Sequence, residues 1–90
     1  MSNVVDLPTQ RVAVAVYEKK SCPGCHATKR WLEKRGITYT AVDISTDPTA
    51  RAYVVDVLGY MQAPVIVLST GEHWSGFQPD LLQEHLEPAA

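Results

Sequence analysis

The chain has 90 residues, of which 46% are apolar and 20% charged, a composition typical of one folded domain. Its formal net charge of -2, from 8 basic and 10 acidic residues, argues against a nucleic-acid-binding protein. The longest apolar run, residues 63–68, is too short to cross a bilayer, and the first residues lack the features of a signal peptide. We therefore expect a cytoplasmic protein with a single domain over residues 1–90, in which residues 1–10 form a short lead-in.

The first predicted elements are a strand and a helix. In residues 11–17, RVAVAVY, valines alternate with two alanines and a tyrosine, which predicts a strand that is covered on both faces and lies centrally in its sheet. Pro23 suits the first position of a helix, which should run to about Arg35. Gly36 then suits the left-handed turn that follows a helix end.

The middle of the chain predicts a second strand and a second helix. Residues 37–44, ITYTAVDI, alternate in part and have one more polar face, which favours an edge strand. Thr46 or Asp47 can cap a helix that continues to Leu58 and ends at Gly59.

The last third predicts a hairpin and a third helix. Residues 64–68, PVIVL, are typical of a buried strand, and residues 72–75, EHWS, are its expected hairpin partner. A helix should open at Pro79 and Asp80. The predicted order is therefore β-α-β-α-β-β-α, with a parallel first strand pair joined by a crossover helix and an antiparallel last pair.

Cys22 and Cys25 are the only cysteines, and they fall between the first strand and the first helix. A cysteine at a helix N-terminus is activated because unpaired backbone N–H groups and the helix dipole stabilise its thiolate. We therefore predict Cys22 as the nucleophile and Cys25, one turn inside, as the resolving cysteine. The simplest alternative is that the two cysteines are small core residues without a chemical role. Another is that they bind a metal together with His26, although a closed zinc site requires four ligands.

Ala63 and Pro64 stand directly before the apolar strand. A proline at the first residue of a strand is a tolerated position and needs no further explanation. An X–Pro bond can also be cis, and sequence alone does not decide between the isomers.

The order of elements, with C-x-x-C after the first strand, resembles the thioredoxin fold in its short glutaredoxin-like form, a four-stranded mixed sheet flanked by three helices. Two stretches, CHATKR at 25–30 and WSGFQPD at 74–80, narrow this to a resemblance with the NrdH-redoxin family. The stretch LGYMQAPV at 58–65 also matches that family's pattern. The resemblance covers residues 12–86.

This resemblance implies a thiol-disulfide oxidoreductase that reduces the large subunit of a class Ib ribonucleotide reductase and is itself reduced by thioredoxin reductase. It implies a monomer with no cofactor of its own, because NADPH and FAD belong to the partner reductase, and with no nucleic-acid or membrane partner. It also implies a cis-proline at Pro64. The substrate-contacting positions that it implies are Ala63, Pro64, Trp74, Ser75, Gly76 and Phe77.

Two departures from the family pattern bear on the site. The insert between the cysteines is Pro-Gly, where Val-Gln is more usual, and Gln78 stands where an arginine is usual. We expect Gly24 to let a protein substrate approach the sulfurs closely. Both changes leave the dithiol mechanism intact.

Rival interpretations remain at this point. A glutathione-dependent glutaredoxin is the first. Against it, Phe77 is bulky and Pro79 has no N–H to donate, so the turn before the last helix is less suited to binding a small anionic ligand. A metal-binding or iron-sulfur module is the second. Trp74 and Phe77 can equally be local core, and the basic side chains near the cysteines, namely Lys19, Lys20, Lys29 and Arg30, are expected to form a solvated surface.

Overall fold

The computed structural model describes residues 12–86, and the predicted lead-in at residues 1–10 lies outside this part. The elements are β1 (Val14–Glu18), α1 (Pro23–Lys34), β2 (Thr40–Asp43), α2 (Pro48–Ala52), a π-helical turn η1 (Tyr53–Val57), β3 (Val65–Leu68), β4 (His73–Ser75) and α3 (Pro79–Leu86). Their order is the predicted β-α-β-α-β-β-α order, with the second helix divided in two.

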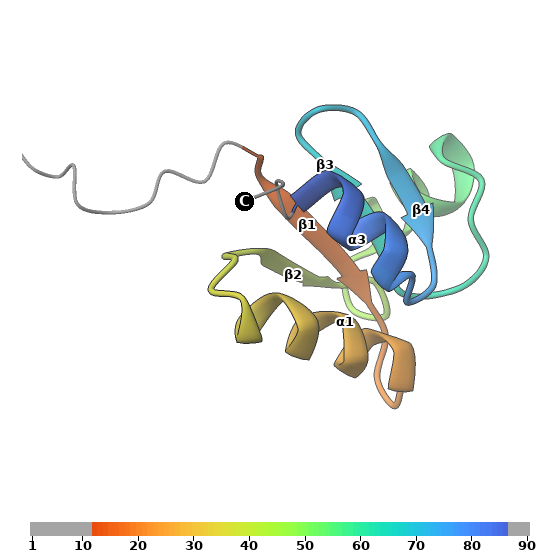
Figure 1. The fold of residues 1–90 in the computed structure, drawn as a ribbon. Coiled ribbons are helices and arrows are strands. Elements are labelled where there is room, and N and C mark those ends of the chain that lie inside the picture. Colours follow the sequence, from red (N-terminus) through yellow and green to blue (C-terminus); the bar gives the residue numbers. More distant parts are fainter. Residues whose placement is uncertain (1–11, 87–90) are drawn as a thin grey trace, which may run out of the picture.

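One four-stranded sheet with the order β2-β1-β3-β4 organises the molecule (Figure 1). β1 and β2 are parallel, whereas β3 is antiparallel to both β1 and β4. This confirms the predicted central position of the first strand, the edge position of the second and the hairpin at the end. The architecture is the thioredoxin fold.

The two faces of the sheet carry separate apolar clusters, as the alternation in β1 predicted. Val14 and Val16 belong to the larger cluster, which α1 and α3 supply with Leu32 and Leu82. Tyr17, on the opposite face of β1, packs on the smaller cluster formed by Ile44, Val54 and Val65 beneath α2 and η1. The sheet is therefore covered on both sides, with α1 and α3 together on one of them (Figure 1).

β2 begins at Thr40 rather than at the predicted Ile37, because the residues after α1 complete a helix cap. The N–H of Gly36 bonds to the carbonyl of Glu33, and the N–H of Ile37 bonds to the carbonyl of Leu32, both at 3.1 Å or less. Gly36 has the positive φ of 67° that this Schellman motif requires. Because the N–H of Ile37 is bonded within this cap, β2 begins only after it.

The second helix is not α-helical to Leu58 as predicted. It starts as expected, with the carboxylate of Asp47 accepting a hydrogen bond from the N–H of Ala50 at 3.0 Å. From Tyr53 onward it widens, and the N–H of Leu58 bonds to the carbonyl of Tyr53 five residues back.

No helix within residues 12–86 is long and apolar enough to cross a membrane.

Candidate active site

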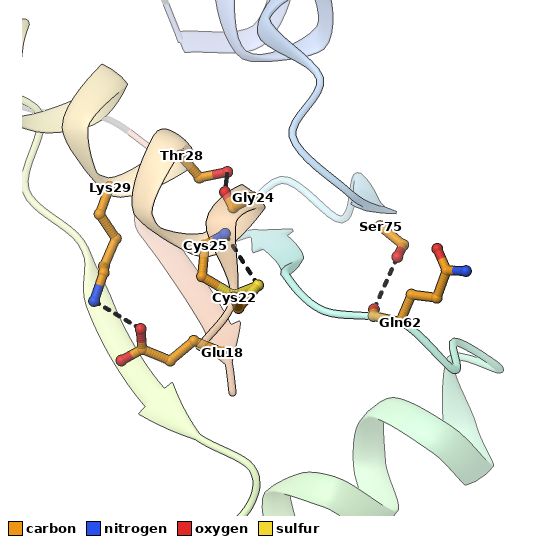
Figure 2. Close-up of a disulfide and its surroundings, with 8 residues drawn as sticks. All are labelled: Glu18, Cys22, Gly24, Cys25, Thr28, Lys29, Gln62 and Ser75. Atoms are coloured by element: carbon orange, nitrogen blue, oxygen red, sulfur yellow. Dashed lines mark hydrogen bonds and ion pairs between the residues drawn. A yellow bond between two sulfur atoms is a disulfide. The ribbon is translucent and has the colours of Figure 1, made fainter. Parts of the chain in front are cut away.

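Cys22 and Cys25 lie at the start of α1 and are joined by a disulfide, with their Cα atoms 5.2 Å apart (Figure 2). Cys22 is the N-cap residue, with extended backbone angles of φ -115° and ψ 104°, and Pro23 occupies the first helical position. Pro23 needs no hydrogen-bond acceptor there because it has no N–H. The sequence thus places one sulfur before the helix and the other inside its first turn.

The two sulfurs have different environments. Cys25 is 2% exposed, whereas Cys22 is partly exposed. The backbone N–H of Cys25 donates a hydrogen bond to Sγ of Cys22 at 3.1 Å (Figure 2). A donor at a helix N-terminus stabilises a thiolate, so this geometry favours Cys22 as the sulfur that meets an external disulfide. Cys25 can attack only from within, through Cys22.

Pro64 lies against the cysteine loop. The Ala63–Pro64 peptide bond is cis, as the resemblance implied. Pro64 is buried, and a Cβ atom built on Gly24 would lie 3.1 Å from Cδ of Pro64. The segments that carry the two motifs, far apart in sequence, are therefore packed on each other at the dithiol.

Two hydrogen bonds fix the Pro64 loop to the end of β4. The hydroxyl of Ser75 donates to the carbonyl of Gln62 at 2.9 Å, and the N–H of Gly76 donates to the carbonyl of Pro64 at 2.8 Å (Figure 2 shows the first). Ser75 and Gly76 thus hold the loop in place from the side of β4. Ala63 makes no hydrogen bond to any residue of the described part, which leaves its N–H and carbonyl free for an extended chain.

The structure separates Trp74 from Phe77. Trp74 is 5% exposed, belongs to the larger core cluster and stacks on the imidazole of His85, with ring centroids 5.8 Å apart. Phe77 is 38% exposed, and its Cβ would lie 3.9 Å from a Cβ atom on Gly24. Of the two aromatic side chains, only that of Phe77 therefore reaches the surface next to the dithiol.

The environment of Gly24 differs from the expectation that it leaves room for a substrate. Its α-carbon faces Pro64 and Phe77, which are parts of the protein itself. A larger residue here would require Pro64 to shift by a few tenths of an ångström, so glycine favours close packing of the cysteine loop on its neighbours.

Lys29 is not part of a free solvated surface, in contrast to the expectation from sequence. Its ammonium group pairs with the carboxylate of Glu18 at 2.7 Å, and both side chains are only 20–25% exposed (Figure 2). Glu18 also lines, with Cys25 and Asp43, a shallow hollow of about 280 Å³ beside the dithiol. Hydrogen bonds from Ser45 hold the pKa of the Asp43 carboxyl below its ordinary value.

Sequence reasoning missed Glu18 because its role depends on a contact between β1 and α1. One signal was present, since Lys29 follows Cys25 by four residues and so shares its face of the helix. Thr28 was also missed, although its hydrogen bond lies within α1. It is fully buried, and its hydroxyl donates to the carbonyl of Gly24 at 2.8 Å, which braces the first turn of α1.

The turn before α3 uses some of its hydrogen-bond donors within the protein. The N–H of Gly76 is used by Pro64, and Pro79 has none. The amide of Gln78 donates to the carbonyl of Ser75 at 2.9 Å, so this side chain is folded back onto the turn. Within residues 12–86 no three His, Cys, Asp or Glu side chains are grouped as metal ligands would be.

Comparisons with known proteins agree with this geometry. The glutaredoxin family model matches residues 14–74. The glutaredoxin-like protein NrdH of Salmonella typhimurium is 36% identical over 80 residues, which cover 88% of this chain and 96% of that protein. The gene 56 protein of Mycobacterium phage D29 is 33% identical over 79 residues, which cover 88% of each chain.

A solved structure is similar over nearly the same range. It is that of the glutaredoxin-like protein NrdH-redoxin from Escherichia coli, which is described as having a thioredoxin-like activity profile. It superposes with a TM-score of 0.75 at 35% identity and covers 87% of this chain and 99% of that one. With its cysteine pair at the mouth of α1, the chain is a thiol-disulfide oxidoreductase of the glutaredoxin family and belongs to the NrdH-redoxins.

Proposed function

We propose that the protein carries electrons from thioredoxin reductase to a protein disulfide, namely that of the large subunit of a class Ib ribonucleotide reductase. The observation that carries the proposal is the hydrogen bond from the Cys25 N–H to Sγ of Cys22, combined with the burial of Cys25. This arrangement suits attack on a substrate disulfide by Cys22 and release of the reduced substrate by Cys25. The likeness to the NrdH proteins supports the choice of partners.

The reaction proceeds in two exchanges. The thiolate of Cys22 attacks one sulfur of the substrate disulfide, forms a mixed disulfide and expels the other substrate sulfur as a thiolate. Cys25 then loses its proton and attacks Sγ of Cys22, which releases the second substrate thiolate. The protein ends with the Cys22–Cys25 disulfide and two electrons fewer. The dithiol of thioredoxin reductase then reduces this disulfide by the same chemistry.

The electron source separates this function from that of a glutathione-dependent glutaredoxin. The thioredoxin-like activity profile of the Escherichia coli relative supports thioredoxin reductase. The turn at residues 76–79 gives weaker support: the Gly76 N–H and the Gln78 side-chain amide are bonded within the protein, and Pro79 has no N–H. We further propose that the protein acts in the cytoplasm as a monomer without a bound cofactor or metal, and that NADPH and FAD work in the partner reductase.

Two experiments test the proposal. NADPH oxidation coupled to reduction of an oxidised class Ib ribonucleotide reductase should proceed when thioredoxin reductase is present. It should not proceed when glutathione and glutathione reductase replace thioredoxin reductase. Turnover with the glutathione system alone would establish the glutaredoxin alternative. Separately, the Cys25→Ser variant should accumulate a mixed disulfide with the large subunit of ribonucleotide reductase. If this variant turns over normally and forms no mixed disulfide, the roles assigned to the two cysteines are wrong.

A further inference from the structure

Thr28, one turn after Cys25 in α1, is the only buried residue with a hydroxyl, amide or charged side chain within residues 12–86. It is 0% exposed, and its hydroxyl donates to the carbonyl of Gly24 at 2.8 Å. Because the side chain has no contact with bulk water, the hydroxyl depends on this acceptor. A threonine that bonds back to the carbonyl four residues earlier slightly destabilises a helix. The bond is therefore of interest for where it lies and not for the stability of α1.

The carbonyl that Thr28 engages belongs to the same peptide group as the N–H that faces the nucleophile. This peptide joins Gly24 to Cys25, and its N–H donates to Sγ of Cys22 at 3.1 Å. The Thr28 hydroxyl, the peptide and the sulfur thus form one continuous chain of hydrogen bonds (Figure 2). In such a chain each bond polarises the next, so a donor at the carbonyl oxygen makes the N–H a stronger donor.

The strengthening matters most after reduction. A hydrogen bond to an ionised acceptor is roughly twice as strong as one between neutral groups, so the polarised N–H favours the thiolate of Cys22 over its thiol. A serine or threonine hydroxyl elsewhere in α1 would not act on this N–H, because it would engage a different peptide group.

From this chain we infer that Thr28 is a positioning residue for the nucleophile: its hydroxyl strengthens, through the Gly24–Cys25 peptide, the hydrogen bond that stabilises the Cys22 thiolate. Thr28 acts through the peptide and takes no part in the exchange of sulfur bonds. The inference rests on the role of Cys22 in the proposed function, but it does not depend on which proteins donate or accept the electrons. Its consequence is that more of Cys22 is in the attacking form at neutral pH than the helix N-terminus alone would give.

Titration of Cys22 in the fully reduced protein, followed by NMR through its Cβ chemical shift, tests the inference. Thr28→Val removes the hydroxyl and keeps the shape of the side chain, whereas Thr28→Ser keeps the hydroxyl and removes the methyl group. In the valine variant the midpoint of the titration should rise by about 0.3–0.5 pH unit, which lowers the thiolate fraction below the midpoint about twofold to threefold. Thr28→Ser should keep the wild-type midpoint, even though the lost methyl group lowers its Tm.

Two results with the variants would overturn the inference. One is an unchanged midpoint in the valine variant, and the other is an equal rise in the valine and serine variants, which would show an effect of packing alone. If the valine variant does not fold, the wild-type protein still decides. Its Thr28 hydroxyl proton should be protected from exchange and should shift together with the Cys25 amide proton as Cys22 ionises. A hydroxyl proton that exchanges as in an exposed threonine, or stays fixed while the amide proton moves, would overturn the inference.

Failure of the inference and failure of the proposed function give different results. A wild-type midpoint at or above about 8.5, the value of an ordinary thiol, would overturn both, because there would be no stabilised thiolate for Thr28 to support. Failure to reduce ribonucleotide reductase, together with the predicted difference between the valine and serine variants, would refute only the proposed partners and would support the role of Thr28.

Discussion

Gly24 provides a sharp test of the packing at the dithiol, because two opposing effects of an added methyl group can be weighed. In the first turn of a helix, alanine is favoured over glycine by up to about 0.5–1 kcal/mol. Against this, the new Cβ would meet Cδ of Pro64 at 3.1 Å and the backbone nitrogen of Phe77 at 3.8 Å. Carbon atoms prefer separations of about 3.5–4.0 Å, and overpacking of this kind costs about 1–3 kcal/mol.

The packing cost should win. We expect Gly24→Ala to lower the free energy of unfolding of the oxidised protein by about 1 kcal/mol, which corresponds to a fall in Tm of about 4–8 °C for a domain of this size. Thermal unfolding followed by circular dichroism measures it, and amide NMR spectra should show the Phe77 signal displaced.

Gly36→Ala is the control for this prediction. Gly36 has a φ of 67° and no atom within 4 Å of an added Cβ, so the loss there, about 1–2 kcal/mol, comes from backbone strain alone. It should leave the Phe77 signal and the rate of disulfide exchange unchanged, whereas Gly24→Ala should alter both. A Gly24→Ala variant as stable as the wild-type protein, with Phe77 undisturbed, would refute the close packing of the loop on its neighbours.

Three further predictions concern single side chains that stabilise the fold. Burial and the hydrogen bond to Glu33 raise the pKa of Tyr39 to about 12, above the ordinary value near 10. The contribution of Tyr39 to the free energy of unfolding is therefore complete below pH ~10 and is lost as the pH rises towards ~12. Tyr39→Phe should therefore flatten the fall in urea-measured stability across that window, and an identical fall in both proteins would contradict the assignment. Glu18→Gln should cost about 0.5–1 kcal/mol in urea unfolding, and a double-mutant cycle with Lys29→Met should show coupling of that order, whereas zero coupling would count against the ion pair. Asp47→Ala should cost about 1 kcal/mol through loss of the helix cap and Asp47→Ser should restore most of it, so a fully stable alanine variant would argue against the cap.

The secondary structure followed from local chemistry wherever that chemistry was decisive. The alternation in residues 12–17 predicted a strand with two covered faces, and its two sets of side chains do enter the two separate clusters. Gly36 predicted the end of α1, and Asp47 predicted the start of α2. The local pattern did not predict the widened turn after Ala52, nor the cap of α1 that includes Ile37 and delays β2.

The catalytic pair was predictable because its chemistry depends on spacing and on a helix start, both of which are visible in sequence. The isomer of Pro64 was not, since an X–Pro bond can take either form and only the family resemblance favoured cis. The pairing of Lys29 with Glu18, the core position of Trp74 and the crowding around Gly24 depend on which elements meet in space. Nothing local in the sequence specifies these contacts.

The central claim is that the first turn of α1 stabilises a thiolate at Cys22 and leaves Cys25 shielded. The most direct measurement is the rate of alkylation of the fully reduced protein by iodoacetamide as a function of pH, with the modified cysteine identified by mass spectrometry. We predict that Cys22 alone is modified and that its reactivity rises at a pH clearly below the value of about 8.5 of an ordinary thiol. Modification of Cys25 first, or reactivity of Cys22 that appears only at or above that value, would contradict the account.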